Sequence, residues 1–243
     1  MELARIRSAT TPEDLTKVAR FRYRIYVEEM GRFQQYADHK EKTVHEPLDR
    51  HGHILMALED SNVVGTVRFN LGSESEFGPY TELYRLRELG ALFPNRVSIT
   101  TKLMIAPEYR RTPLALKLAL ASYKCGSARG VDIDAMDCNP PLRPFFTKLG
   151  YRQIFGAIDH PEYGYVIPMF LAVRDKCHLK QVGSPFYKFA QSLEQDDDSA
   201  DTLNSLAELC RPTPVDSIGL SPILKEAAMT ECSQQVRAES ENC

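Results

Sequence analysis

The chain has 243 residues, of which 43% are hydrophobic and 26% charged, the composition of a soluble globular protein with one sizeable core or a domain plus a tail. No stretch approaches the ~20 apolar residues that a membrane-spanning helix needs, and the first residues lack the apolar core of a signal peptide. Six scattered cysteines without a C-x-x-C pair indicate reduced thiols, which predicts a cytoplasmic protein.

Charge and composition change near residue 195. From Asp196 onward ten acidic and three basic residues give a net charge of −7, which leaves +4 on the body of the chain. This acidic segment has few aromatic residues and cannot offset its ordering entropy by burial. We therefore predict a folded domain over residues 1–190 and an acidic tail over residues 191–243 that is largely disordered or loosely docked. The mildly basic body suits an anionic ligand or an acidic carrier partner, and it is too weakly charged to indicate nucleic acid.

The first half of the chain predicts a strand, a long helix, a hairpin and a short helix. Thr11-Pro-Glu-Asp14 has the N-cap, the first-turn proline and the early acids of a helix start. Two runs rich in β-branched residues, joined by four turn residues, predict a hairpin. The expected elements are a strand at residues 3–6, a helix at 11–30, a loop at 33–46, strands at 53–58 and 63–71, and a helix at 81–89.

The central stretch predicts a strand, an arginine-bearing turn and a capped helix. Residues 97–105 suit a half-buried strand, and Pro107 ends it. Arg110 and Arg111 follow, and Thr112 and Pro113 are a plausible N-cap and first helical residue. The free N–H groups at such a helix start favour a phosphate group. The alternative is an ordinary βα unit with solvated arginines. The turn is not a nucleotide P-loop, because the glycine run and its lysine are absent.

The second half predicts alternating strands and helices. The expected elements are strands at residues 131–137, 151–158 and 165–173, a helix at 143–149 that Gly150 ends, a helical turn at 174–182, and a possible helix at 186–193. The complete order of elements predicts an α+β fold, with a mixed and mostly antiparallel sheet that contains one parallel crossover.

Two groups of polar residues in the first half are candidate site residues. Arg68 lies in mid-strand and, if buried, needs an acid such as Glu46 or Asp49. The segment from His45 to His53 gathers metal-capable groups, although hydrogen-bonded loop histidines explain it as well and no metal is predicted.

Several motifs resemble those of the GNAT acyltransferases. Arg110-Arg-Thr-Pro-Leu-Ala115 occupies the place of that family's turn for the coenzyme A pyrophosphate, with Pro113 where a glycine is usual. Three further segments resemble the branch formed by the acyl-homoserine-lactone synthases and the long-chain N-acyl amino acid synthases. They are Phe21-Arg-Tyr-Arg-Ile-Tyr-Val-Glu-Glu-Met-Gly31, the acid Asp49 followed by Val64-Gly-Thr-Val-Arg68, and Tyr163-Gly-Tyr-Val-Ile-Pro-Met169.

This resemblance implies a GNAT-like splayed sheet flanked by helices. It implies an N-acyltransferase that uses an acyl-CoA or acyl-carrier-protein thioester, without a metal, to acylate the amine of an amino acid or similar metabolite. The cleft would lie between the strands at 97–105 and 131–137. Its implied donor-binding residues are Leu103, Met104, Ile105, Arg110, Arg111, Thr112, Pro113, Leu114 and Ala115. The expected catalytic residues are Asp49, Arg68 and Thr101, and the expected substrate-binding residues are Arg22, Glu46 and Asp137.

The chain departs from this family pattern at two proton-carrying positions. Ile99 stands where the synthase branch has an acid, and Phe146 stands where a tyrosine often protonates the leaving thiolate. We therefore expect the base to be Asp49, Glu46 or Asp137, and Arg22 and Arg68 either to hold an acceptor carboxylate or to form structural ion pairs. Two other functions stay open: a non-catalytic module that binds an acyl thioester or carrier, and a lactone-forming synthase that uses S-adenosylmethionine.

Overall fold

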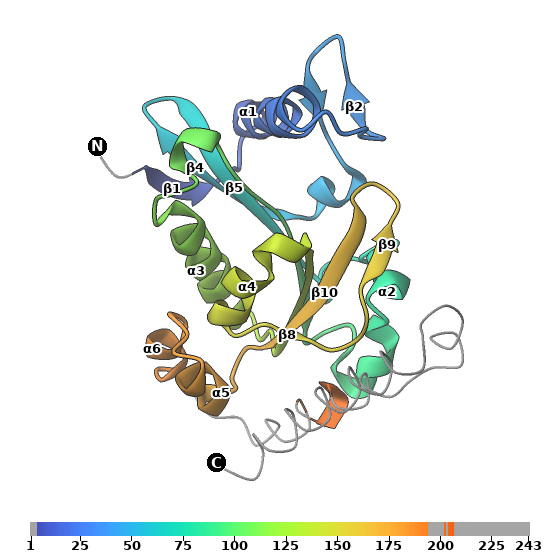
Figure 1. Cartoon of the computed structure of the whole chain (residues 1–243), viewed down its shortest axis with the longest axis vertical. Coiled ribbons are helices and arrows are strands. Elements are labelled where there is room, and N and C mark those ends of the chain that lie inside the picture. The colour runs from blue at the N-terminus through green and yellow to red at the C-terminus, as the bar shows by residue number, and fades with distance from the viewer. Residues whose placement is uncertain (1–3, 194–201, 203, 207–243) are drawn as a thin grey trace.

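The computed structural model describes residues 4–193, 202 and 204–206, and within them eight strands form one open sheet (Figure 1). Their order is β1-β4-β5-β6-β7-β10-β8, with β9 beside β10. Of the paired neighbours, β6 and β7 are parallel and the others antiparallel, which confirms the predicted α+β class. The strands are β1 (Arg5–Ser8), β4 (His53–Glu59), β5 (Asn62–Leu71), β6 (Val97–Ile105), β7 (Ile133–Cys138), β8 (Arg152–Gln153), β9 (Ile158–His160) and β10 (Gly164–Ala172).

Helices cover both faces of this sheet and divide the core into two clusters. Along β10, Met169 and Leu171 pack with α3 and α4, whereas Phe170 and Ala172 pack with the segment around α2. This alternation is the two-residue period of a strand that is buried on both faces. The helices are α1 (Pro12–Tyr23), α2 (Tyr80–Leu83), α3 (Leu114–Ser127), α4 (Arg143–Leu149), α5 (Lys176–Gln181) and α6 (Tyr187–Ala190). Of these, none is long and apolar enough to cross a bilayer.

Local signals explain where the well-predicted elements begin and end. Thr11 caps α1 by accepting a hydrogen bond from the Asp14 N–H (3.2 Å), as its position predicts. Helix α4 has the expected bounds, and Gly150 ends it with φ +112°. A Cβ at Gly150 would lie 2.5 Å from a methyl carbon of Leu179, so both the conformation and the space favour glycine.

Other expected elements are interrupted. The helix expected over residues 11–30 is α-helical to Tyr23 and continues as a π-helical turn, Arg24–Glu29. The helix expected at 81–89 is divided at Arg85 (φ +54°) into α2 and a 3₁₀ helix, Leu86–Leu92. The strand expected at 151–158 is divided into β8 and β9, and the expected loop at 33–46 contains a hairpin of β2 (Ala37–Asp38) and β3 (Thr43–Val44). The spacing of apolar residues in the sequence does not indicate where these helices and strands are interrupted, because the interruptions depend on tertiary contacts.

The structure shows the state of several cysteines. Cys125 and Cys138 are free, but Cys177 is disulfide-bonded, so the expectation of reduced thiols throughout is wrong for this residue.

Most of the predicted tail over 191–243 lies outside the described residues. Within it, Leu206 is buried against the cluster around α2. The division into a domain and a tail stays a prediction.

The parallel pairing of β6 with β7 is short. The register joins Val97 to Ile133, Ser98 to Asp134 and Ile99 to Ala135, and no pair follows. Farther along β6, the register with β5 shifts between Thr66 and Arg68, opposite Lys102, which has φ +56°. This bulge bends β6, so the two strands diverge beyond their first residues. The predicted opening between these strands is therefore present.

Asp134, at the base of this opening, should make the stability of the protein depend on pH. It accepts hydrogen bonds from the hydroxyls of Thr100 (3.0 Å) and Tyr151 (2.6 Å), and burial raises its pKa to about 6. Because the folded state then binds this proton more tightly than the unfolded chain, the free energy of unfolding should fall by up to roughly 3 kcal/mol as pH rises from about 4 to about 6.

We expect Asp134→Asn to remove this fall, measured by urea unfolding across that pH range. Asp14 and Asp49, whose folded-state pKa values are about 2, change stability up to about pH 5, but they do so in both proteins, so the difference between wild type and variant isolates Asp134. An unchanged pH dependence in the variant would show that Asp134 is ionised at all these pH values.

Candidate active site

A cavity of about 830 Å³ occupies the opening between β6 and β7. Its walls come from β6 (residues 100–105), from the end of β7 and the loop after it (136–139), and from the turn and first helical residues at 110–112, 115 and 116. The π-helical turn, the start of α4 and the segment before β10 complete it. A volume of this size accommodates a small-molecule substrate.

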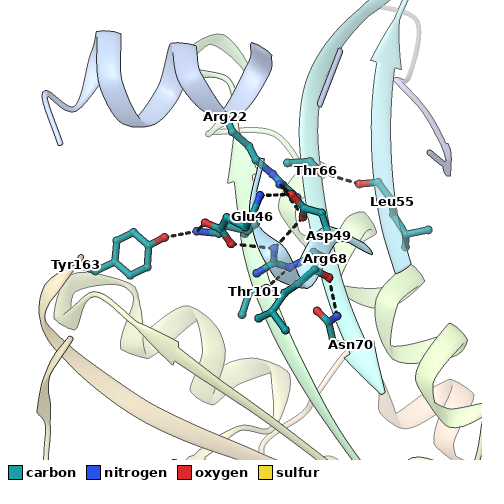
Figure 2. Close-up of polar contacts among 11 residues, drawn as sticks. Arg22, Glu46, Asp49, Leu55, Thr66, Arg68, Asn70, Thr101 and Tyr163 are labelled. Carbon is teal, nitrogen blue, oxygen red and sulfur yellow. Dashed lines mark hydrogen bonds and ion pairs between the residues drawn. The ribbon is translucent and has the colours of Figure 1, made fainter. Parts of the chain in front are cut away.

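A network of buried charges lies next to this cavity (Figure 2). Arg22 of α1 contacts Asp49 (2.7 Å), and Arg68 of β5 contacts both Asp49 (2.8 Å) and Glu46 (2.9 Å). Glu46 caps a single 3₁₀ turn (Pro47–Arg50) that contains Asp49, and the Glu46 N–H donates to the Asp49 carboxylate (2.8 Å). The structure thus brings together four predicted site residues from three separate segments, although none of the four lines the cavity.

The surroundings of these acids make them poor bases. Burial by itself raises the pKa of Asp49, but Arg22 and Arg68 outweigh it and lower the pKa to about 2. Burial likewise opposes ionisation of Glu46, and Lys102 and Arg68 lower its pKa. A carboxylate held in this way has little tendency to accept a proton. The geometry therefore favours the structural ion-pair interpretation of Arg22, Glu46, Asp49 and Arg68 over catalytic or carboxylate-binding roles.

Thr101 and Lys102 connect the network to the cavity, whose wall both residues form. The Thr101 hydroxyl accepts a hydrogen bond from Arg68 Nε (3.0 Å). Lys102 Nζ contacts Glu46 and the Tyr163 hydroxyl, and lies over the rings of Tyr26 and Tyr163. Three cations and two anions leave this cluster with a surplus positive charge. Lys102 is the cation of the cluster that reaches the cavity.

Asp137 is the carboxyl group that the structure places in the cavity wall. The Tyr84 hydroxyl donates a hydrogen bond to its Oδ2 (2.7 Å). Burial raises the pKa of Asp137 more than Tyr84, His160 and Lys102 lower it. A partly exposed carboxyl with a raised pKa can accept and release a proton closer to neutral pH than an ordinary aspartate. Of the three acids expected as candidate bases, Asp137 has the suitable position and environment.

The turn before α3 forms another part of the cavity, as expected for a phosphate site. Arg110, Arg111, Thr112 and Ala115 line it, together with Leu103, Met104 and Ile105 of β6. Arg110 is held by Glu29 (2.6 Å) and by the Ile105 carbonyl (3.1 Å). Pro113 and Leu114 do not line the cavity: Pro113 occupies the N-cap position of α3, with the Leu114 N–H donating to the Thr112 hydroxyl (3.3 Å), and Leu114 is buried in the core.

Sequence reasoning missed an aromatic group at the cavity. Tyr26 stacks on Tyr163 with ring centroids 5.6 Å apart, and Tyr80 lies in the same lining. Tyr80 is the first residue of the short helix α2 and Tyr163 precedes β10, and no local sequence signal indicates that either ring faces the cavity. At the candidate metal segment, His53 binds Glu74 (2.7 Å) and stacks on Phe69. Among the described residues, no three His, Cys, Asp or Glu side chains gather as metal ligands.

Comparisons with solved structures identify proteins of similar fold. A CoA-dependent acyl-homoserine lactone synthase, BjaI, is 18% identical with a TM-score of 0.56, covering 82% of this chain and 98% of that one. FeeM, an N-acyl amino acid synthase from uncultured soil microbes, is 16% identical with a TM-score of 0.57, covering 76% and 97%. Escherichia coli ElaA is 10% identical with a TM-score of 0.50, covering 70% and 99%. These likenesses support the fold, and the predicted GNAT-like architecture is confirmed.

Comparisons of sequence identify the family. No curated protein matches the chain. The family described as "N-acyl amino acid synthase FeeM" matches residues 17–172, which is well over half of the sequence and includes both strands of the opening, the arginine-bearing turn and Asp137. The chain therefore belongs to the FeeM family of N-acyl amino acid synthases and is an acyltransferase that catalyses N-acyl transfer.

Proposed function

We propose that this enzyme moves an acyl group from an acyl-CoA or acyl-carrier-protein thioester to the amine of an amino acid or a similar small metabolite. The observation that carries the proposal is the cavity of about 830 Å³ between the diverging strands, where a thioester arm and an amine can meet. The name of one fold relative, a CoA-dependent synthase, supports a thioester donor. Use of a carrier protein and the cytoplasmic location predicted from the sequence are parts of the same proposal.

The donor is assigned to the β6 and α3 walls. Beyond Ile99, no described strand pairs with the β7-facing edge of β6, so backbone groups on that edge near Leu103 and Met104 are available to bind the thioester carbonyl and the pantetheine arm. An N–H placed where negative charge develops on that carbonyl contributes about 10²–10³ in rate. The phosphates belong at Arg110 and Arg111, beside the start of α3.

The acyl chain is assigned to the apolar part of the same cavity. Leu116 and Phe145 come from α3 and α4, and Met104 and Met136 come from the two diverging strands. Methionine side chains are flexible and adapt to the shape of a bound chain. Burial of an acyl chain contributes about 0.8 kcal/mol for each CH₂ removed from water.

The acceptor amine is assigned to Asp137. The nitrogen attacks the thioester carbon, its proton passes to the Asp137 carboxylate, and the carbon–sulfur bond breaks with its electron pair going to sulfur. Phe146 cannot protonate the leaving group, but a thiol with a pKa of roughly 8.5 leaves as a thiolate far more readily than an alcohol leaves as an alkoxide. Asp137 thereby replaces the acid that the synthase branch has at the position of Ile99.

Mass spectrometry of lipid extracts from cells that express the protein tests the reaction. We expect N-acyl species that are absent from cells with an empty vector and from cells that express Asp137→Asn, and their masses identify acyl chain and acceptor. Asp159→Asn, an exposed aspartate on the neighbouring β9, serves as the matched active control. Acyl-homoserine lactones as the sole new products would instead support the lactone-forming alternative. Binding of acyl thioester without any new amide would contradict the proposal.

Arg111→Ala should weaken binding of the donor. Among the described residues Arg111 has no acid partner, so its guanidinium is free to hold a phosphate. Loss of one or two charge-assisted hydrogen bonds predicts a rise of about ten-fold in KM for acyl-CoA. The same variant should use an acyl-pantetheine, which lacks the nucleotide phosphates, as well as the wild type does. An equal loss with both donors would contradict phosphate binding at Arg111.

Asp137→Asn should lower kcat by about 10²–10⁴, the usual contribution of a general base. Because Asp137 must be ionised to accept the proton, wild-type activity should rise with pH through its pKa, which burial places above the ordinary 3.8. In a plot of activity against pH, the variant should lose the rise at acidic pH that is due to Asp137 and keep the rise that is due to deprotonation of the acceptor amine. Initial rates across the pH range measure both, and a variant with the wild-type rise at acidic pH would exclude Asp137 as the base.

A further inference from the structure

We propose that Arg32 binds a carboxylate on the acceptor, so that the acceptor site takes amines that carry a carboxylate near the amino group. This inference rests on the proposed function and adds the group by which the acceptor is recognised. The sequence analysis expected Arg22 and Arg68 in that role, but both are buried, both bind Asp49, and neither lines the cavity.

The argument begins with the cations of the cavity wall. Four of them are described: Arg32, Lys102, Arg110 and Arg111. Lys102 is paired with Glu46 and Arg110 with Glu29. Arg32 and Arg111 have no acid partner among the described residues, and Arg32 is half-buried whereas Arg111 is exposed.

Arg32 points toward the wall that holds Asp137. Its Nη2 lies 3.5 Å from the side-chain oxygen of Asn139, two residues after Asp137, and its guanidinium lies 5.7 Å from the centre of the Tyr163 ring. Arg110, in contrast, binds Glu29 and the carbonyl of Ile105, the last residue of β6 before the arginine-bearing turn. The two unpaired arginines therefore divide between the two substrates: Arg111 lies in the phosphate-binding turn and Arg32 on the side of the base.

The local structure orients the Arg32 guanidinium and leaves its donors available. The Arg32 N–H donates to the Tyr26 carbonyl (2.9 Å), which anchors the backbone directly after the π-helical turn. Tyr26 stacks on Tyr163, so the ring beneath the guanidinium is itself held in place. A guanidinium has five N–H donors, and the contact with Asn139 is long, so a carboxylate can bind in the bidentate geometry that arginine favours.

This arrangement matches the charges of an amino acid. The amino group lies near the Asp137 carboxylate, while the adjacent carboxylate meets Arg32. The surplus positive charge of the cluster at Lys102 also favours an anionic acceptor over a neutral one. An amine without a carboxylate would leave Arg32 without an ion-pair partner and would lack the binding energy of that ion pair.

Steady-state kinetics with a charge-cancelled acceptor test the inference. The probes are the standard amino acids and their methyl esters, with one fixed acyl-CoA as donor. We expect wild type to prefer the free acid, and Arg32→Gln to raise KM for the acid about ten-fold or more while leaving KM for the ester and for acyl-CoA unchanged. Arg32→Lys should keep part of the preference. Arg20→Gln, an exposed arginine of α1, is the matched control.

Each alternative outcome overturns the inference in a recognisable way. Equal losses with acid and ester would make Arg32 a structural residue. A higher KM for acyl-CoA alone would assign it to the donor phosphates, and a wild type without preference for the acid would remove the carboxylate from recognition. If wild type acylates no amine, the proposed function itself fails. Calorimetric titration of the same amino acids into wild type and Arg32→Gln without donor then decides the binding role separately.

Discussion

The pairing between β6 and β7 stops after Ile99 and Ala135, and every part of the candidate site depends on where it stops. Three pairs of parallel residues hold the strands together at their base, where the buried Asp134 of β7 accepts hydrogen bonds from the hydroxyls of Ser98 and Thr100 of β6 and of Tyr151. Beyond that point β6 has a bulge around Lys102 in its pairing with β5. Fully paired strands would satisfy their own backbone groups and leave no edge for a thioester.

A bulge with a lysine in the left-handed region costs roughly 1–2 kcal/mol and needs support. The buried charge network supplies it from the β5 side. Arg68 holds the Thr101 hydroxyl, and Glu46 holds the Lys102 ammonium, so the two residues at the bend are each fixed to the network. Asp49 in turn joins Arg68 to Arg22 of α1. The network thus ties the helix, the 3₁₀ turn and both central strands around one bend.

Ion pairing separates the charged residues that support the site from those to which we assign a role in catalysis or binding. Glu46, Asp49, Arg22 and Arg68 neutralise each other in the interior, where one unpaired charge would be very unfavourable. Asp137, Arg32 and Arg111 line the cavity and form no ion pair with another described residue, so a bound ligand of opposite charge would lower their free energy. The same distinction explains why Asp49 has a low pKa and Asp137 a raised one.

The sequence by itself determined the elements whose signals are local: the capped start of α1, the β4–β5 hairpin, the arginine-bearing turn before α3, and α4 with Gly150 at its end. It also indicated the strands that separate, through motifs whose order resembles a known family. It did not determine which of many charged side chains would face the cavity. Arg22 and Asp49 are 27 residues apart, and Arg32 and Asn139 are 107 apart, so their contacts form when the whole sheet is assembled. Tertiary structure decided the division of roles, because the pKa and the pairing of a charge depend on burial and neighbours that no local pattern encodes.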